Sequence, residues 1–211
     1  MSMNRAVLAS VLACAGVMSA ASQIAPVAET QQTGATAIQP RLGAFLFEIT
    51  GLADPRGAAY DAAGRLFVAD SGHDRVAVFD ANGKLERAIG RRGSGRGDLL
   101  RPQGVALADD GTVFVADTGN DRIQQFNAAG EPISVWGARG SRDGEFCDPV
   151  ALALHGERVY VVDAGNHRVQ ALGRDGRFIR TMGSDTSDVD RRLNHPSDVA
   201  IDSTGGVYVA A

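Results

Sequence analysis

Aspartate and arginine occur three times in this sequence at a fixed spacing of five residues, each time just after an apolar run. The three pairs are Asp70 with Arg75, Asp117 with Arg122, and Asp163 with Arg168. A carboxylate can accept backbone N–H groups of a loop while a guanidinium clamps it through two parallel hydrogen bonds. Such an arrangement satisfies polar groups that would otherwise be buried without partners. A residue type that recurs at the same place in successive similar segments is required by the fold of those segments. A catalytic residue would be expected to occur once, so we interpret these pairs as structural and not catalytic.

Arginine is also concentrated in three segments that differ in sequence, residues 91–101, 138–148 and 184–195. The candidate binding residues are Arg91, Arg92, Arg96, Arg139, Arg142, Arg191 and Arg192. Acidic residues are interspersed among them. Loops that a rigid scaffold holds often carry binding residues, so we predict one loop face that recognises a protein, peptide or glycan partner. An ordinary solvated rim is the alternative interpretation.

Histidine and cysteine form no motif for metal binding or nucleophilic catalysis. The four histidines, His73, His155, His167 and His195, are scattered along the chain. Cys147 has no second cysteine or histidine nearby, which indicates buried filler. Zinc sites need three or four clustered ligands. We therefore predict no catalytic residue, no metal site and no cofactor, and the sequence favours a non-catalytic protein. Asp198 and Gln103 are the polar residues to inspect for an ion.

Composition narrows the class of partner. The chain has 211 residues, 44% of them hydrophobic and 22% charged, which is typical of a globular protein. Its formal net charge of −4 gives no concentrated positive surface for phosphates, so we predict no nucleic acid partner. Glycine is frequent, with 26 residues, and this indicates many tight turns.

The N-terminal residues are typical of an export signal. Arg5 precedes an apolar run from Ala6 to Val17, and small residues follow, so residues 1–21 are predicted to be a signal peptide. The protein is then periplasmic or secreted. A lipoprotein cleavage box ending at Cys14 is the alternative, and it would add a lipid anchor. Residues 22–41 are predicted to be a flexible leader, and no later segment is apolar enough to span a membrane.

A repeat of 47 residues organises the rest of the chain. Its positions are marked by Pro55, Pro102, Pro149 and Pro196. A fixed period of this size is typical of propellers and solenoids. Four short runs with strand character follow each of the first three prolines, and glycine-containing turns separate them. Because no helical periodicity is present, we predict an all-β fold, a β-propeller built from four-stranded antiparallel blades.

Residues 42–211 hold about 3.6 of these repeats. Residues 45–49 match the fourth strand of a blade, so we expect them to supply an outer strand to another blade. Three or four blades rarely close a ring. We therefore expect part of a longer propeller, with ring completion by self-association as the alternative.

The loop after the second strand of each blade carries a family resemblance. Residues 115–123 (Val-Ala-Asp-Thr-Gly-Asn-Asp-Arg-Ile) and 162–169 (Val-Asp-Ala-Gly-Asn-His-Arg-Val) resemble the signature of NHL repeats. Phe126, Trp136-Gly137 and residues 143–146 before Pro149 are similar to the family pattern as well. The resemblance covers essentially residues 42–211 and implies a six-bladed propeller that usually acts as a scaffold for partners.

The same resemblance implies an alternative function. Some relatives are metal-dependent enzymes, namely peptidyl-hydroxyglycine amidating lyases and, more distantly, lactonases of the gluconolactonase type. The lyases tend to place a histidine just after the blade proline. The corresponding residues here are Arg56, Gln103, Val150 and Ser197, so no histidine can be carried over.

Overall fold

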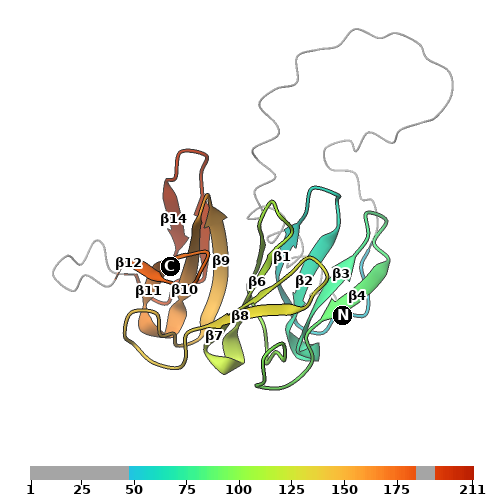
Figure 1. Ribbon diagram of the computed structural model, residues 1–211, viewed down its shortest axis with the longest axis horizontal. Coiled ribbons are helices and arrows are strands. Elements are labelled where there is room, and N and C mark those ends of the chain that lie inside the picture. The colour runs from blue at the N-terminus through green and yellow to red at the C-terminus, as the bar shows by residue number, and fades with distance from the viewer. Residues whose placement is uncertain (1–47, 184–192) are drawn as a thin grey trace, which may run out of the picture.

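The computed structural model describes residues 48–183 and 193–211, and these residues form small antiparallel sheets that fan out side by side (Figure 1). Blade 1 consists of β1 (Pro55–Tyr60), β2 (Leu66–Asp70), β3 (Arg75–Phe79) and β4 (Leu85–Ile89). Blade 2 consists of β5 (Val105–Leu107), β6 (Val113–Asp117), β7 (Arg122–Phe126) and β8 (Pro132–Trp136). Blade 3 consists of β9 (Pro149–His155), β10 (Arg158–Asp163), β11 (Arg168–Gly173) and β12 (Phe178–Met182). The hairpin of β13 (Asp198–Ile201) and β14 (Val207–Ala210) begins a fourth blade.

Each blade joins its four strands in chain order, every neighbour antiparallel. The predicted all-β propeller of four-stranded blades is therefore confirmed. Residues 1–47 and 184–192 lie outside the described residues, and with them the predicted signal peptide, the leader and most of the expected strand at 45–49. Glu48 and Ile49 are described and form no strand. In the described ranges, no helix has the length and apolar character needed to cross a membrane.

Glycine shapes the hairpins as the sequence predicts. Gly64 closes the β1–β2 turn with a φ of +79°, and Gly111 closes the β5–β6 turn with a φ of +82°. A side chain at either position would be strained in this left-handed conformation. These turns define what we call the hairpin end of the blades.

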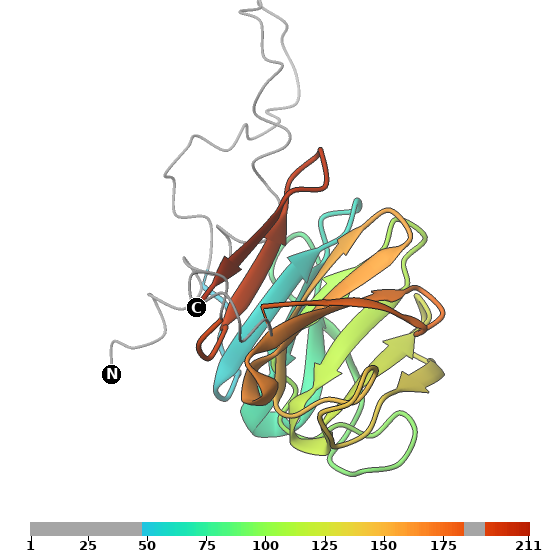
Figure 2. The ribbon, with the colours of Figure 1, turned by 90° about the vertical axis from the view of Figure 1, so that its left-hand side faces the viewer.

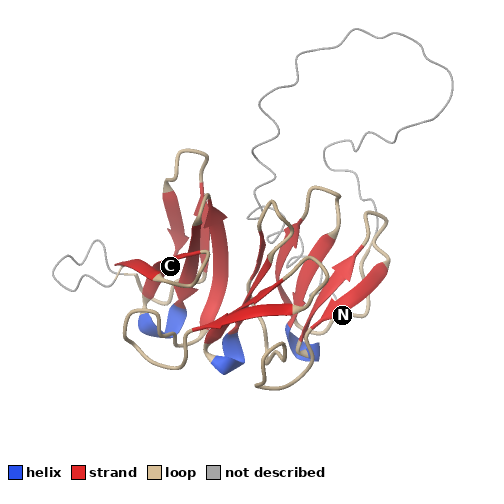
Figure 3. Cartoon of the chain, in the orientation of Figure 1, coloured by secondary structure: helices blue, strands red, loops and turns tan. Residues whose placement is uncertain are grey.

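A short 3-10 turn, which the sequence analysis did not anticipate, lies at the opposite end of each complete blade (Figure 3). The three turns are η2 (Ser71–His73), η3 (Thr118–Asn120) and η4 (Ala164–Asn166). Each ends at a residue in the left-handed conformation, and these residues are Asp74, Asp121 and His167. We call this end of the blades the loop end, because the connections that enter blades 2 and 3 also lie there.

Apolar side chains between neighbouring blades form the core, and Figure 2 shows the sheets stacked in this way. Between blades 1 and 2, Phe67 and Val78 pack with Val113 and Val115. Between blades 2 and 3, Phe114 and Trp136 pack with residues of β10 such as Val161. Blades 2 and 3 each bury both of their faces against neighbouring sheets, which is why their inner strands are apolar on both sides.

The exposure of one aromatic position in the second strand shows whether a neighbouring sheet covers that face of the blade. Phe67, Phe114 and Tyr160 occupy equivalent places in the second strands and are 2%, 0% and 1% exposed. Tyr208 occupies the same place in β14 and is 63% exposed. The difference arises because, among the described residues, no further sheet packs on this face of the fourth hairpin.

The third strands of blades 2 and 3 bury polar side chains. Polar residues at alternate positions are typical of a half-exposed strand, yet Gln124 in β7 and Gln170 in β11 are fully buried. The Nε2 group of Gln124 donates to Asp117 Oδ2 at 3.0 Å, and that of Gln170 donates to Asp163 Oδ2 at 3.2 Å. The amides are buried because the carboxylate that each one binds is itself inside the blade.

Inner strands of neighbouring blades approach closely at the loop end. The Gly57 N–H donates to the Gln103 carbonyl at 2.7 Å. A Cβ at Gly57 would lie 2.5 Å from the same oxygen, so only glycine fits at this position. This contact sets the spacing between β1 and β5.

At the hairpin end, Arg174 of blade 3 donates to Asp110 Oδ2 of blade 2 at 2.6 Å. The backbone N–H of Thr112 is the main cause that lowers the Asp110 pKa to about 2, and the Arg174 hydrogen bond adds to it. This ion pair is solvent-exposed, with the Asp110 side chain 56% accessible, so water screens it.

We predict that Phe114→Ala destabilises the protein by about 3 to 5 kcal/mol, because it leaves a cavity between blades 2 and 3. Tyr208→Ala is the matched control at the equivalent position and should cost less than about 1 kcal/mol, since its ring is mostly in water. The measurement is the free energy of unfolding from urea titration. Equal losses for the two variants would contradict the stacking described above.

Acidification should remove the contribution of Asp110. Its pKa is depressed in the folded state, so the stabilisation is present above about pH 4 and is lost as the pH falls toward about 2. Urea unfolding of the wild type and Asp110→Asn should differ by about 1 kcal/mol or less near neutral pH. The difference should vanish near pH 2. A difference in the free energy of unfolding that grows on acidification would show that ionised Asp110 does not stabilise the folded protein.

Candidate functional site

The recurring aspartate at the end of the second strand is the centre of a hydrogen-bond network in each blade. In blade 2, Asp117 is fully buried and its Oδ1 accepts the Leu100 N–H at 2.7 Å. Its Oδ2 accepts Arg122 Nε at 2.7 Å and Asn120 Nδ2 at 2.9 Å, in addition to the Gln124 amide. The carboxylate at the end of β6 thus joins the loop that enters the blade to the 3-10 turn and to β7.

The equivalent aspartates have almost the same partners. Asp70 accepts Ala53 N–H and Arg75 Nε, at 2.7 and 2.8 Å. Asp163 accepts Cys147 N–H and Arg168 Nε, both at 2.7 Å. Blade 1 differs in one respect, since His73 Nδ1 lies 2.9 Å from Asp70 Oδ2, where blades 2 and 3 use an asparagine.

The guanidiniums do not form the two-pronged clamp expected from the sequence. Arg122 places only Nε on Asp117 and turns its other nitrogens to the carbonyls of Ser94, Gly95 and Asp98. Arg168 does the same with the carbonyls of Arg142 and Glu145. The arginine therefore fixes the entering loop to the blade, and this sets the shape of segments 91–101 and 138–148.

A second contact links each blade to the next at the loop end. The carboxylate of Asp74 accepts the Arg101 N–H at 2.7 Å, and that of Asp121 accepts the Asp148 N–H at 2.9 Å. At the third junction, His167 Nδ1 accepts the His195 N–H at 3.1 Å. The donor residues stand just before the blade prolines and share a φ of about +50°. These junctions were not predicted from the sequence, although the 47-residue spacing of the donor residues was a usable signal.

The predicted binding arginines separate into two groups. Arg96 is bound to blade 2, because it donates to the carbonyls of Pro132 and Ile133 on β8. Arg91, Arg92 and Arg139 extend from the loop end with side chains 87%, 81% and 81% exposed.

Arg142 is also exposed. Its backbone joins the loop network through the contacts with Glu145 and Arg168. Arg191 and Arg192 lie outside the described residues.

Acidic partners accompany the exposed arginines. Arg91 Nε donates to Asp98 Oδ1 at 2.9 Å. Arg92 Nε lies 3.9 Å from Asp74 Oδ2, and Arg139 Nη1 lies 3.6 Å from Asp121 Oδ2. The last two distances are too long for hydrogen bonds, so these guanidiniums keep their donors for solvent or a partner.

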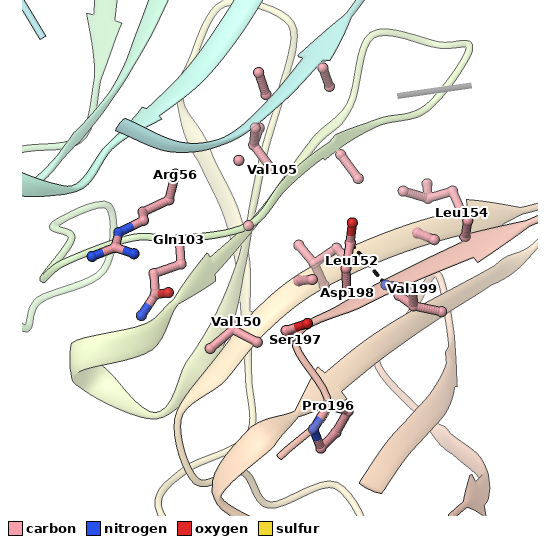
Figure 4. A pocket seen from close by; sticks show the side chains of 18 of the residues that line it. Arg56, Gln103, Val105, Val150, Leu152, Leu154, Pro196, Ser197, Asp198 and Val199 are labelled. Carbon is pink, nitrogen blue, oxygen red and sulfur yellow. Dashed lines mark hydrogen bonds between the residues drawn. The ribbon is translucent and has the colours of Figure 1, made fainter. Parts of the chain in front are cut away.

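A concave surface of about 1000 Å³ runs along the inner strands β1, β5, β9 and β13. Arg56, Gln103, Ser197 and Asp198 line it near the loop end, and Figure 4 shows Arg56 and Gln103 extending in the same direction. Arg56 forms an ion pair with Asp54 at 3.0 Å. The Asp198 carboxylate accepts the adjacent Val199 N–H at 2.8 Å and is thereby turned toward its own backbone (Figure 4).

Histidine, cysteine and acidic side chains do not converge on a metal-binding geometry in residues 48–183 and 193–211. His167 and His195 pack edge to face, with ring centroids 4.3 Å apart. Burial raises the pKa of the Cys147 thiol, and the charge of Asp148 adds to this effect. A thiol with a raised pKa is a poor nucleophile at neutral pH.

Comparison with known proteins identifies the repeat. The model of the NHL repeat matches residues 52–79, 99–126 and 146–172, which span the first three strands of each complete blade. A search of curated proteins finds no significant match.

Solved structures with a similar fold include a nidogen–laminin complex (23% identity, TM-score 0.59), streptogramin B lyase (11%, 0.58) and hydrazine synthase of Kuenenia stuttgartiensis (16%, 0.57). In each case 75% of this chain is covered, against 56%, 48% and 42% of the other chain. The chain thus spans about half the length of the propellers it matches. At these identities the likeness concerns the fold alone.

We predict that Asp117→Asn destabilises the protein by about 3 to 5 kcal/mol, because the new amide places N–H donors against Arg122, Asn120 and Gln124. The exposed Asp109→Asn in the same blade is the control and should change stability by less than about 0.5 kcal/mol. Urea unfolding measures both. A loss below about 1 kcal/mol for Asp117→Asn would show that the carboxylate does not organise the blade.

Proposed function

Because this chain is an NHL-repeat protein with a β-propeller fold, we propose that it is a non-catalytic binding protein that holds a protein, peptide or glycan partner. The partner binds at the loop end of the blades. The observation that supports this most strongly is the exposure of Arg91, Arg92 and Arg139 on loops whose backbones are held by buried groups. These side chains are not used to stabilise the blades.

The described loops 91–101 and 138–148 are held in shape by hydrogen bonds within the chain itself. Backbone hydrogen bonds close the segment from Arg91 to Leu99, one between these two residues and one from Gly93 to Leu99. The Arg122 guanidinium donates to the carbonyls of Ser94 and Gly95 in the same segment. A preformed surface loses less conformational entropy on binding than a flexible one. The buried network therefore favours recognition by these loops.

A metal-dependent lyase or lactonase is the alternative that the family resemblance implies. Such an enzyme would need at least three converging ligands, and the described part of the chain brings no such group together. The concave surface instead offers the ion pair of Arg56 with Asp54, together with Gln103. These groups suit hydrogen bonding to a ligand, so the geometry supports binding better than metal-assisted chemistry.

The expected location agrees with a binding role outside the cytoplasm. Residues 1–21 have the pattern of a signal peptide, so we place the partner in the periplasm or outside the cell. This compartment suits proteins, peptides and glycans and makes a nucleic acid partner less suitable.

The test is binding of the full chain to peptide and glycan arrays. A variant with Arg91, Arg92, Arg139 and Arg142 changed to alanine should lose the ligands that the wild type captures, by roughly tenfold or more in affinity. Arg158→Ala, an exposed change in β10 at the hairpin end, is the control and should retain them. Retention of all ligands by the fourfold variant would refute binding at the loop end. Stoichiometric metal with lyase or lactone-hydrolysing turnover would instead establish an enzyme.

A further inference from the structure

Two of the exposed arginines occupy the same structural position in consecutive blades. Arg92 and Arg139 are 47 residues apart, and each forms the same isolated bridge, with Leu99 and Phe146 respectively. Both are 81% exposed, and each points one edge of its guanidinium toward the carboxylate of a left-handed aspartate, Asp74 or Asp121. The surface therefore presents an equivalent arginine at the junction of blades 1 and 2 and at the junction of blades 2 and 3.

The aspartates orient these arginines without binding them fully. One oxygen of Asp74 and one of Asp121 is already occupied by the N–H of the next blade. The other oxygen lies 3.9 Å from Arg92 Nε or 3.6 Å from Arg139 Nη1, beyond hydrogen-bond distance. A guanidinium has five N–H donors in a planar fork, so most of each fork is left for an external acceptor. Exposed ion pairs of this kind contribute little to stability, so stability alone does not explain them.

Of the two junctions whose loops the structure describes in full, the first has the greater excess of cations. Arg101, which donates its backbone N–H to Asp74, has an exposed side chain that forms no ion pair within the described residues. Together with Arg91 and Arg92 it places three arginines near two carboxylates, Asp98 of the same loop and Asp74 of blade 1. The second junction has two arginines, Arg139 and Arg142, with four acidic residues, Asp121, Asp143, Glu145 and Asp148. Attraction of an anion is thus stronger between blades 1 and 2 than between blades 2 and 3.

We propose that the loop end binds an acidic polypeptide segment, with one of its carboxylates on Arg92 and Arg101 and a second on Arg139. This inference rests on the proposed function and specifies its partner. A planar carboxylate matches the free fork of a guanidinium through two parallel hydrogen bonds.

The interspersed acids distinguish this partner from a continuous polyanion. Asp98, Asp143 and Asp148 lie on the same loops and would repel the closely spaced phosphates or sulfates of a nucleic acid or a sulfated glycan. Separate carboxylates avoid these positions. An extended chain carries its side chains alternately on two sides, so aspartates or glutamates at spaced positions can reach successive junctions.

The experiment measures fluorescence anisotropy of a fluorescein-labelled peptide of alternating Glu and Gly with the full chain. The matched probe replaces each Glu by Gln. We expect the Glu peptide to bind, with an affinity that falls as salt rises, and the Gln peptide not to bind. Arg92→Ala and Arg139→Ala should each weaken binding roughly tenfold. Arg101→Asn, which tolerates the left-handed backbone, should weaken it similarly, whereas Arg158→Ala should have no effect.

Arg92→Lys separates recognition by charge from recognition by the paired hydrogen bonds of the guanidinium. It keeps the charge but loses the fork, so it should recover only part of the lost affinity. Equal binding of the Glu and Gln peptides, no binding of the Glu peptide, or tighter binding of single-stranded RNA or heparin through the same arginines would overturn the proposal. Capture of neutral array ligands that the fourfold arginine variant loses would also overturn it, while leaving loop-end binding itself intact.

Discussion

A buried carboxylate that accepts hydrogen bonds from several directions holds each blade to the loop that enters it. Asp117 accepts hydrogen bonds from the backbone N–H of residue 100, from the asparagine side chain of the 3-10 turn, and from two side chains of the following strand. A charge without water is costly unless it is fully hydrogen-bonded, so all of these donors must be in place together. This requirement explains why arginine, asparagine and glutamine surround the aspartate, and why the loop adopts one conformation.

Apolar stacking and backbone contact complete the architecture. Phenylalanine or tyrosine on one blade packs against valines of the next, while Gly57 and Gly104 allow the inner strands to approach closely. The stacked faces bind the blades together, and the carboxylate network gives each blade its internal order. Substitutions in the two systems should therefore act through different causes, one by a cavity and the other by unsatisfied donors.

The function that we propose depends on the side chains that neither the stacking nor the carboxylate network uses. Arg122 and Arg168 are hydrogen-bonded within the carboxylate network, and Arg96 is hydrogen-bonded to the edge of β8. Arg92 and Arg139 have neither role, although they recur with the blade. Recurrence alone indicates a structural residue, but recurrence combined with exposure and an incomplete set of hydrogen bonds is the basis of the binding surface that we propose.

The sequence by itself determined the repeat, the four strands of each blade and the glycine turns, because strand periodicity and left-handed turns depend on neighbouring residues. It also marked Asp117 and Arg122 as a recurring pair. Only the tertiary structure decided which arginines are free, since Arg92 and Arg96 stand four residues apart in one loop and differ solely in what lies beside them. Likewise, the burial of Gln124 and the junction of Asp74 with Arg101 depend on contacts between segments distant in the chain, which no local pattern specifies.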